Sequence, residues 1–387
     1  MKDFIFRMPT KIHFGVGSSQ KIGTVLKDET GFQKAFIATG SGIVNAGIIA
    51  QIEEGLQAGG MDYVIYDELI PEPTVEVVDQ AAEVLRQSGA DVVIAVGGGS
   101  PIDTAKAMCL LQTHEGSCRD YLFGGTKTVT GPILPLVAVP TTAGTGSELT
   151  AASVISNEQE RTKVSITSDF LIPQMVFIDP LLQLGMPPFI TATTGMDALT
   201  HAIEAYVSLN ASPISDMFAL QAIEMIGKNL RTAVSAGSNL EARCNMAIAS
   251  TIAGAAFMNG GLGVVHGIAQ TIGAFAHVAH GTANALLLPY CMERNVVGNL
   301  EKFRNIAVAL GENVEGLSLR EAADTAVDAV FRLAQDLRVP MTLKEVGVNR
   351  GMFGDIAKDV MNYRLLAVNP CKITEKDVIE ILENAYE

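Results

Sequence analysis

The chain has no tryptophan, and it contains few cysteines, aromatic residues or basic residues. Its five cysteines are widely spaced and include no C-x-x-C pair, which excludes a disulfide framework and a zinc ribbon. Lysine and arginine number 27 against 42 aspartates and glutamates, so the formal net charge is −15. A chain of this charge repels polyanions, and we therefore expect no nucleic-acid partner.

Long apolar runs are also missing. No stretch reaches the roughly 20 residues that a membrane-spanning helix requires, and Met1-Lys2-Asp3-Phe4 lacks the apolar core of a signal peptide. We expect a cytoplasmic protein with no membrane partner. The chain has 387 residues, of which 48% are hydrophobic and 18% charged, and this indicates a globular protein of two domains.

The two halves of the chain differ in pattern. In the first half, short apolar runs alternate with segments of helical periodicity. We predict strands at 34–39, 63–66, 91–96 and 135–140 and helices at 49–58 and 75–88. Such alternation predicts a mainly parallel sheet covered on both faces. After Met186-Pro187-Pro188 only long helical stretches follow, with candidates at 216–230, 241–257, 319–337 and 375–386.

The strand at 91–96 runs into a glycine-rich turn, Gly97-Gly98-Gly99-Ser100-Pro101. Three glycines let backbone N–H groups approach an anion, and the N-terminus of the next helix adds partial positive charge. We expect Ser100 to be the N-cap of that helix and Asp103 to complete a capping box. The turn matches neither G-x-G-x-x-G nor a Walker loop, but its place after a parallel strand predicts a pyrophosphate site.

A second polar turn, Pro140 to Glu148, follows the strand at 135–140, and six of its nine residues are threonine, serine or glycine. Two such turns after successive strands predict a dinucleotide site. The expected fold is thus an α/β nucleotide-binding domain with a mainly parallel sheet over residues 1–182. An all-α domain over residues 183–387 would follow it.

Four residues of the second half have the pattern of metal ligands. Asp197 and His201 are four residues apart, which places both on one face of a helix. His266 and His280 would be about 21 Å apart on one straight helix, so the chain must bend between them if both bind one ion. One carboxylate and three imidazoles suit a divalent transition metal with room for a substrate oxygen. Core or surface histidines without a metal are the alternative.

With these motifs the sequence resembles the iron-containing, or group III, alcohol dehydrogenase family. The resemblance covers essentially the whole chain and is carried by five segments: 97–103, 140–145, 195–204, 261–267 and 280–285. It implies a metal-dependent NAD(P)-linked alcohol dehydrogenase or aldehyde reductase. The expected substrates are small primary alcohols, diols or their aldehydes, and the expected assembly is a homodimer or a higher homo-oligomer.

The resemblance also implies roles for individual residues. Asp197, His201, His266 and His280 would bind the metal, Fe(II) in most relatives, with Zn(II) possible. The cofactor, NADP(H) and/or NAD(H), would contact Gly40, Gly97, Gly98, Ser100, Asp103, Thr141, Thr142, Thr145 and Lys163. Phe257 would line the substrate pocket. The donor set by itself suits Fe(II), Zn(II), Co(II) or Mn(II), so the choice of iron comes from the resemblance.

Three departures from the family pattern carry expectations. Many relatives have Asp where this chain has Gly40, and without that carboxylate a 2′-phosphate is not repelled, so we expect NADP(H) to be accepted. Many relatives have a histidine at the position of Gln270, which cannot relay a proton. We therefore expect His277 to be the catalytic proton carrier. Cys371 replaces the arginine of a late Asn-Pro-Arg motif, so substrate specificity is expected to differ.

Two other classes remain open from the sequence. Dehydroquinate-synthase-like lyases share this scaffold, but they need a basic pocket for a phosphorylated acid, and the helical half has no Lys/Arg cluster near the expected ligands. A non-catalytic nucleotide or metal sensor would bind the cofactor without turnover. Consumption of reduced cofactor with simple aldehydes distinguishes a dehydrogenase from both.

Overall fold

The computed structural model describes residues 3–157 and 162–387. Contacts divide the chain into an α/β unit and a helical unit. The α/β unit takes residues 8–142 and 147–185. The helical unit takes residues 186–387, the segment that ends at Arg7, and the short stretch Ala143–Gly146. The middle of the second polar turn therefore belongs to the helical unit. The sequence patterns did not indicate this assignment.

The α/β unit is built on a six-stranded sheet whose neighbouring strands all pair in parallel. The strand order is β1-β8-β5-β4-β2-β3. In that order the strands span Lys11–Phe14, Met175–Ile178, Leu136–Pro140, Val92–Gly97, Lys34–Ala38 and Asp62–Tyr66. The predicted parallel sheet is confirmed. From β2 the chain moves outward to β3 and returns to β4 on the other side of β2, so a topological switch point lies between β2 and β4.

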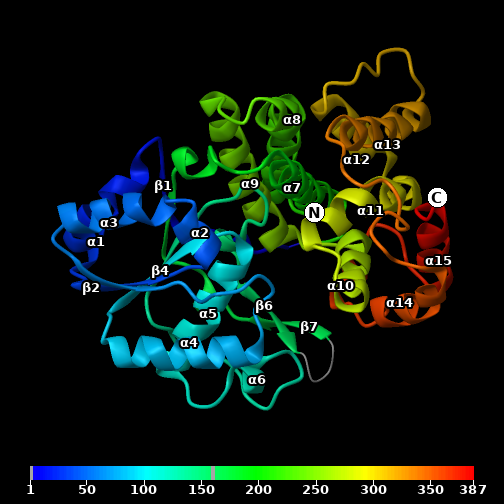
Figure 1. Cartoon of the computed structure of the whole chain (residues 1–387). Coiled ribbons are helices and arrows are strands. Elements are labelled where there is room, and N and C mark those ends of the chain that lie inside the picture. The colour runs from blue at the N-terminus through cyan, green and yellow to red at the C-terminus, as the bar shows by residue number, and fades with distance from the viewer. Residues whose placement is uncertain (1–2, 158–161) are drawn as a thin grey trace. The chain divides into compact units, whose positions relative to one another are not determined.

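Helices cover both faces of this sheet, as Figure 1 shows. α1 (Ile22–Thr30) and α3 (Ile48–Ala58) pack on one face, where their leucines and isoleucines join the alternate residues of β2, β4 and β5 in one apolar cluster. The other face is covered by α4 (Val75–Ser88) and α5 (Gly99–Thr113). The smaller elements are α2 (Ser41–Asn45), α6 (Cys118–Tyr121) and an antiparallel pair of strands, β6 (Ala152–Asn157) and β7 (Thr162–Thr167).

Local sequence signals account for α4. The Thr74 side chain accepts a hydrogen bond from Val77 N and caps the first turn. Gly89 follows the last residue with a φ of 66°, a left-handed conformation in which glycine is not strained. Val78 and Leu85, at helical spacing, are buried against the unit. The predicted bounds of this helix are confirmed.

The helical unit consists of nine α-helices in the described part of the chain. In order, α7 to α15 span Pro188–Val207, Pro213–Ser235, Leu240–Gly260, Val264–Ala276, His280–Asn295, Leu300–Ala309, Leu319–Asp336, Phe353–Val360 and Glu375–Asn384. The predicted change from α/β to all-helical structure is confirmed. α7 is buried over most of its length and packs against α8, α9 and α11. Its side chains therefore face the core of this unit.

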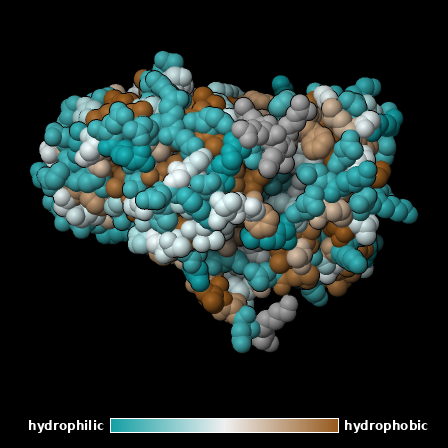
Figure 2. Space-filling model, turned by 90° about the horizontal axis from the view of Figure 1, so that it is seen from below, coloured by the Kyte–Doolittle hydropathy of each residue, from teal (hydrophilic) through white to brown (hydrophobic). Residues whose placement is uncertain are grey.

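No single helix in the described residues is long and apolar enough to cross a membrane. α9 and α10 taken together meet that test, but a bend of 102° separates them. The bend falls next to Gly261, which has a φ of 84°. On the face shown in Figure 2, hydrophilic residues are interspersed with small groups of hydrophobic ones.

Candidate metal centre

Helix α7 carries two of the expected ligands on its buried side. Asp197 and His201 lie one turn apart, and they are 2% and 4% exposed. Pro188 occupies the first turn of this helix, where a missing N–H leaves no hydrogen bond unmade. The prediction that both side chains share a helix face is confirmed.

The chain bends between the other two expected ligands, as the spacing argument required. α10 begins two residues before His266 and ends at Ala276. His277 follows with a φ of 55°, in the left-handed region, and α11 then begins at His280. His266 and His280 therefore occupy the first turns of two different helices.

The four side chains meet in one cluster. One donor atom each from Asp197, His201, His266 and His280 lies within 4.8 Å of all the others. Asp197 Oδ1 is 3.8 Å from His266 Nε2 and 3.7 Å from His280 Nε2. The rings of His201 and His266 stack with their centroids 4.6 Å apart. Donor separations of this size suit ligands placed about 2.0–2.2 Å from one cation.

Burial acts on the pKa values of His201 and Asp197 in opposite directions. It lowers the pKa of His201 to about 3, so this imidazole is neutral at neutral pH. Burial also acts to raise the pKa of Asp197. The three imidazoles, His201 foremost, and a hydrogen bond from Asn284 outweigh that effect and hold the pKa of Asp197 below its ordinary value. A neutral imidazole and an ionised carboxylate are the forms that bind a divalent metal.

Asn284 lies directly against the cluster and is fully buried. Its Nδ2 donates to Asp197 Oδ1 at 2.6 Å and lies 3.2 Å and 3.0 Å from Nε2 of His266 and His280. Its Oδ1 is buried and has no hydrogen-bond partner among the residues that the structure describes. The donor set and its spacing fit a bound divalent metal.

Two of the imidazoles have a second polar contact. His266 Nδ1 lies 2.5 Å from Glu204 Oε2, and His201 Nδ1 lies 3.2 Å from the carbonyl oxygen of Gly144. Sequence reasoning missed Glu204 as a site residue. The signal was available, because Glu204 follows Asp197 by seven residues and His201 by three, which places it on the ligand face of α7.

Phe257 and His277 are placed differently. The Phe257 ring stacks on His201, with centroids 4.3 Å apart and an angle of 19° between the planes. His277 is exposed in the turn between α10 and α11 and is not one of the clustered donors. Of the four clustered side chains, His280 reaches the surface, since its side chain is 41% exposed.

The expected phosphate turn forms at the end of β4. Gly97 has a φ of 152°, and a Cβ there would lie 2.6 Å from the Pro101 ring, so this backbone requires glycine. The N-cap of α5 is Gly98, which makes no side-chain cap hydrogen bond. The prediction that Ser100 is the N-cap is therefore wrong, since Ser100 lies inside the first turn. A glycine N-cap leaves the first N–H groups of the helix open to an anion.

The predicted capping box is also wrong, because Asp103 is held elsewhere. Its carboxylate accepts hydrogen bonds from Ser147 Oγ at 2.5 Å and from Val154 N at 3.0 Å. Lys106 Nζ, which is fully buried, lies 3.7 Å from this carboxylate and donates to the carbonyl oxygens of Ser147 and Ala152, both at 2.7 Å. Burial raises the pKa of Asp103 and lowers that of Lys106 to about 8. This network joins α5 to the chain after the second polar turn.

The remaining residues of the expected cofactor set lie on several elements. Gly40 follows β2 beside the switch point, where a Cβ would meet the Leu69 carbonyl oxygen at 2.7 Å. Thr141 N donates to Gly97 O at 3.0 Å, and a Cβ at Gly98 would lie 3.2 Å from Thr142 Oγ1. Both threonines therefore lie against the phosphate turn.

Two members of that set have other surroundings. Thr145 belongs to the stretch Ala143–Gly146 of the helical unit. Lys163, on β7, forms an ion pair of 2.6 Å with Glu72.

Cys371 lies near the end of α11, with its Sγ 3.8 Å from the Asn295 carbonyl oxygen.

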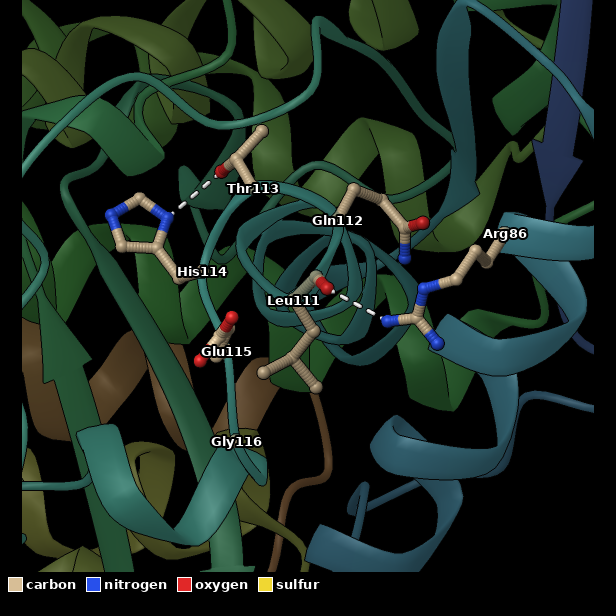
Figure 3. A pocket seen from close by; sticks show the side chains of 7 residues that line it. All are labelled: Arg86, Leu111, Gln112, Thr113, His114, Glu115 and Gly116. Atoms are coloured by element: carbon tan, nitrogen blue, oxygen red, sulfur yellow. Dashed lines mark hydrogen bonds between the residues drawn. The ribbon is translucent and has the colours of Figure 1, made fainter.

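Figure 3 shows a pocket of about 360 Å³ at the C-terminal end of α5. Three of its polar side chains are engaged with their own surroundings, since Arg86 donates to Leu111 O at 2.9 Å and Thr113 Oγ1 lies 2.8 Å from His114 Nδ1. None of the residues expected to bind metal or cofactor lines this pocket. It therefore contributes nothing to the site.

The family models "Iron-containing alcohol dehydrogenase" and "Fe-containing alcohol dehydrogenase family, C-terminal" match residues 9–180 and 191–386. The chain belongs to the iron-containing alcohol dehydrogenase family, and it is an alcohol oxidoreductase of that class. The resemblance seen in the sequence is confirmed, as are the α/β and all-helical architecture.

Individual relatives match over nearly their whole length. The chain is 41% identical to a 1,3-propanediol dehydrogenase of Citrobacter freundii over 385 residues, which is 99% of both chains. It is 39% identical to the lactaldehyde reductase of Escherichia coli K12, over 96% of this chain and 97% of the other. A crystal structure of a 1,3-propanediol oxidoreductase, 38% identical, superposes with a TM-score of 0.96 and covers both chains completely.

Proposed function

We propose that this protein is a metal-dependent, NAD(P)-linked alcohol dehydrogenase or aldehyde reductase acting on small primary alcohols, diols or their aldehydes. The observation that carries this proposal is the convergence of Asp197, His201, His266 and His280 within 4.8 Å, in a chain of the iron-containing family. Relatives named for propanediol and lactaldehyde support the size of the substrate.

The four clustered side chains would hold the metal, for which we propose Fe(II), with Zn(II) as the alternative that the same donors accept. When bound, such an ion supplies Lewis acidity toward an alcohol or carbonyl oxygen, and a nicotinamide supplies uptake or delivery of hydride. The protein's part is to orient the imidazoles toward the ion. Phe257 covers one face of the His201 ring and shields it from water.

The α/β unit would bind the dinucleotide at its switch point. The open N–H groups at Gly98 and the first turn of α5 are suited to the pyrophosphate, with Thr141 and Thr142 beside them. Asp103 is occupied by Ser147 and Val154, so we propose that it supports the turn rather than contacts the cofactor.

We propose that both NADP(H) and NAD(H) are used, because no carboxylate stands at Gly40 to repel a 2′-phosphate. Gly40→Asp should shift the preference toward NAD(H) by about tenfold, on the order of 1.4 kcal/mol. Gly40→Ala is the control, since its Cβ meets the same Leu69 carbonyl oxygen without adding charge. The measured quantity is the ratio of kcat/KM for NAD(H) to that for NADP(H). Equal ratios in the two variants would show that a carboxylate at position 40 does not select the cofactor.

A homodimer or higher homo-oligomer is also proposed. The N-terminal segment exposes large hydrophobic side chains at Phe4 and Ile5, while Phe6 stacks on Phe218 of α8. Apolar groups of this kind are suited to burial against a second copy of the chain.

A substrate panel tests the proposed activity. Iron-loaded protein is assayed with short primary alcohols and diols in the presence of NAD or NADP, and with the matching aldehydes in the presence of the reduced cofactors. We expect turnover in both directions with at least one small substrate. Cofactor binding without turnover on any member would instead favour the non-catalytic sensor.

A further inference from the structure

The carboxylate of Glu204 lies at hydrogen-bond distance from a clustered histidine, His266. It is 4% exposed, on the ligand face of α7. Both of its oxygens are engaged: Oε2 lies 2.5 Å from His266 Nδ1, and Oε1 accepts from Val265 N at 2.8 Å. One buried side chain thus contacts both a metal-ligand candidate and the backbone of the helix that bears it.

Donor and acceptor roles at this contact are determined by chemistry. A backbone N–H only donates, and a carboxylate only accepts. Glu204 therefore accepts from Val265 N on one oxygen and from His266 Nδ1–H on the other. With the proton on Nδ1, the lone pair of His266 is on Nε2, which is the nitrogen that faces Asp197 Oδ1 in the cluster.

The three histidines differ in their surroundings. His201 Nδ1 has a neutral carbonyl acceptor, Gly144 O, at 3.2 Å, whereas His266 has a charged acceptor at 2.5 Å. His280 has a side chain that is 41% exposed. Charge-assisted hydrogen bonds are about twice as strong as neutral ones, so the orientation of His266 is held more firmly than that of His201.

We propose that Glu204 is a positioning residue of the metal centre, which holds His266 in the Nδ1–H tautomer and so presents Nε2 to the cation. The inference rests on the proposed function, because it takes the cluster to be a metal site. Carboxylates in this position orient metal-ligating histidines and raise their basicity. The charge of Glu204 at the N-terminus of α10 is also stabilised by the helix dipole.

A purely structural role is the alternative. α10 begins after Gly263, which makes no side-chain cap, and its first N–H groups are satisfied by Asn369 Oδ1, at 3.1 Å from Val264 N, and by Glu204. If Glu204 only capped the helix, its loss would reduce stability without changing the affinity of the cluster for metal.

Glutamine at this position separates the two roles. Its side chain has one acceptor oxygen and one donor nitrogen, so it can satisfy Val265 N–H or His266 Nδ1–H but not both. If the oxygen accepts from Val265, the amide N–H faces His266 Nδ1 and favours the tautomer whose Nε2 carries a proton. That tautomer opposes binding of a cation at Nε2.

The experiment titrates metal-free wild-type protein and E204Q with Co(II), in competition with a chromophoric chelator, and records the visible spectrum of the bound Co(II). We expect E204Q to bind about 10–100-fold more weakly, with an altered spectrum. The control is Thr271→Val on the same helix, which removes a buried hydrogen bond to Asp359 of 2.9 Å. It should lose about 1 kcal/mol of unfolding free energy with unchanged affinity.

Each outcome decides one question. Wild-type affinity and spectrum in E204Q would overturn the positioning role. Failure of the wild type itself to bind Co(II) would instead contradict the proposed function. Circular dichroism checks folding, and E204D is titrated in parallel because it keeps two acceptor oxygens but lacks the reach to both donors. Wild-type affinity in whichever of the two variants folds would contradict the proposal.

Discussion

The metal cluster and the phosphate turn are built on opposite principles. The cluster uses side chains from α7, α10 and α11, which packing brings within 4.8 Å of one another. The phosphate turn uses the backbone of consecutive residues, and what it requires of Gly97 is the absence of a Cβ. The cluster therefore depends on long-range packing and buried hydrogen bonds, whereas the turn depends on local backbone geometry.

The largest effect should come from His266→Ala. Loss of this imidazole removes one of four donors and should abolish metal retention, with kcat/KM falling by about 1000-fold, on the order of 4 kcal/mol. Metal content by elemental analysis and cofactor binding by calorimetry are measured on the same sample. His114→Ala, at a half-buried histidine of the α/β unit, is the control. Full metal content in His266→Ala would contradict the role of this imidazole as a metal ligand.

Lys106→Met tests the support of the phosphate turn. Removing the ammonium takes a buried donor from the carbonyl oxygens of Ser147 and Ala152, and it takes the positive partner from the Asp103 carboxylate. We expect a loss of about 3–5 kcal/mol of unfolding free energy, measured by denaturant titration. Lys228→Met removes an exposed ion pair with Glu224 and should change stability by less than about 0.5 kcal/mol. Equal losses in the two variants would contradict a structural role for the Lys106 network.

Gly97→Ala tests the turn itself. Alanine at this position would have to adopt a φ of 152°, and its Cβ would lie 2.6 Å from the Pro101 ring. The turn must therefore move. We expect the KM for the cofactor to rise about tenfold, on the order of 1.4 kcal/mol, with metal content unchanged. Metal loss together with weaker cofactor binding would show that the two sites are not separable in this way.

The smallest effect is expected at His277, whose predicted role as proton carrier stays a prediction. His277 has a φ of 55°, a conformation that asparagine tolerates, so His277→Asn preserves the turn and removes the imidazole. We expect kcat to fall by up to about tenfold, with a changed pH profile and unchanged metal content. An unaltered kcat and pH profile would remove His277 from the mechanism.

The sequence predicted the elements that depend on local patterns. The apolar strands at β2 and β4, the capped helix α4 and the shared helix face of Asp197 and His201 all follow from periodicity and from turn residues. The need for a bend between His266 and His280 followed from helix geometry, and the structure places that bend at His277.

The sequence-based predictions were wrong or incomplete where the partners of a residue are distant from it in the sequence. Asp103 has the spacing of a capping box, but Ser147 and Val154 hold its carboxylate instead. Glu204 is acidic within a buried helix, which local patterns do not explain, and only its contacts with Val265 and His266 of α10 show its partners. The placement of Ala143–Gly146 in the helical unit likewise depends on contacts beyond the reach of local patterns.

The central claim is that one cation, held by Asp197, His201, His266 and His280, is required for activity. The most direct test measures metal content and alcohol oxidation on one anaerobic preparation before chelation, after chelation, and after restoring Fe(II). We predict one ion per chain, loss of activity with loss of the ion, and recovery when Fe(II) is returned. Full activity in a preparation stripped of every divalent ion would contradict the account.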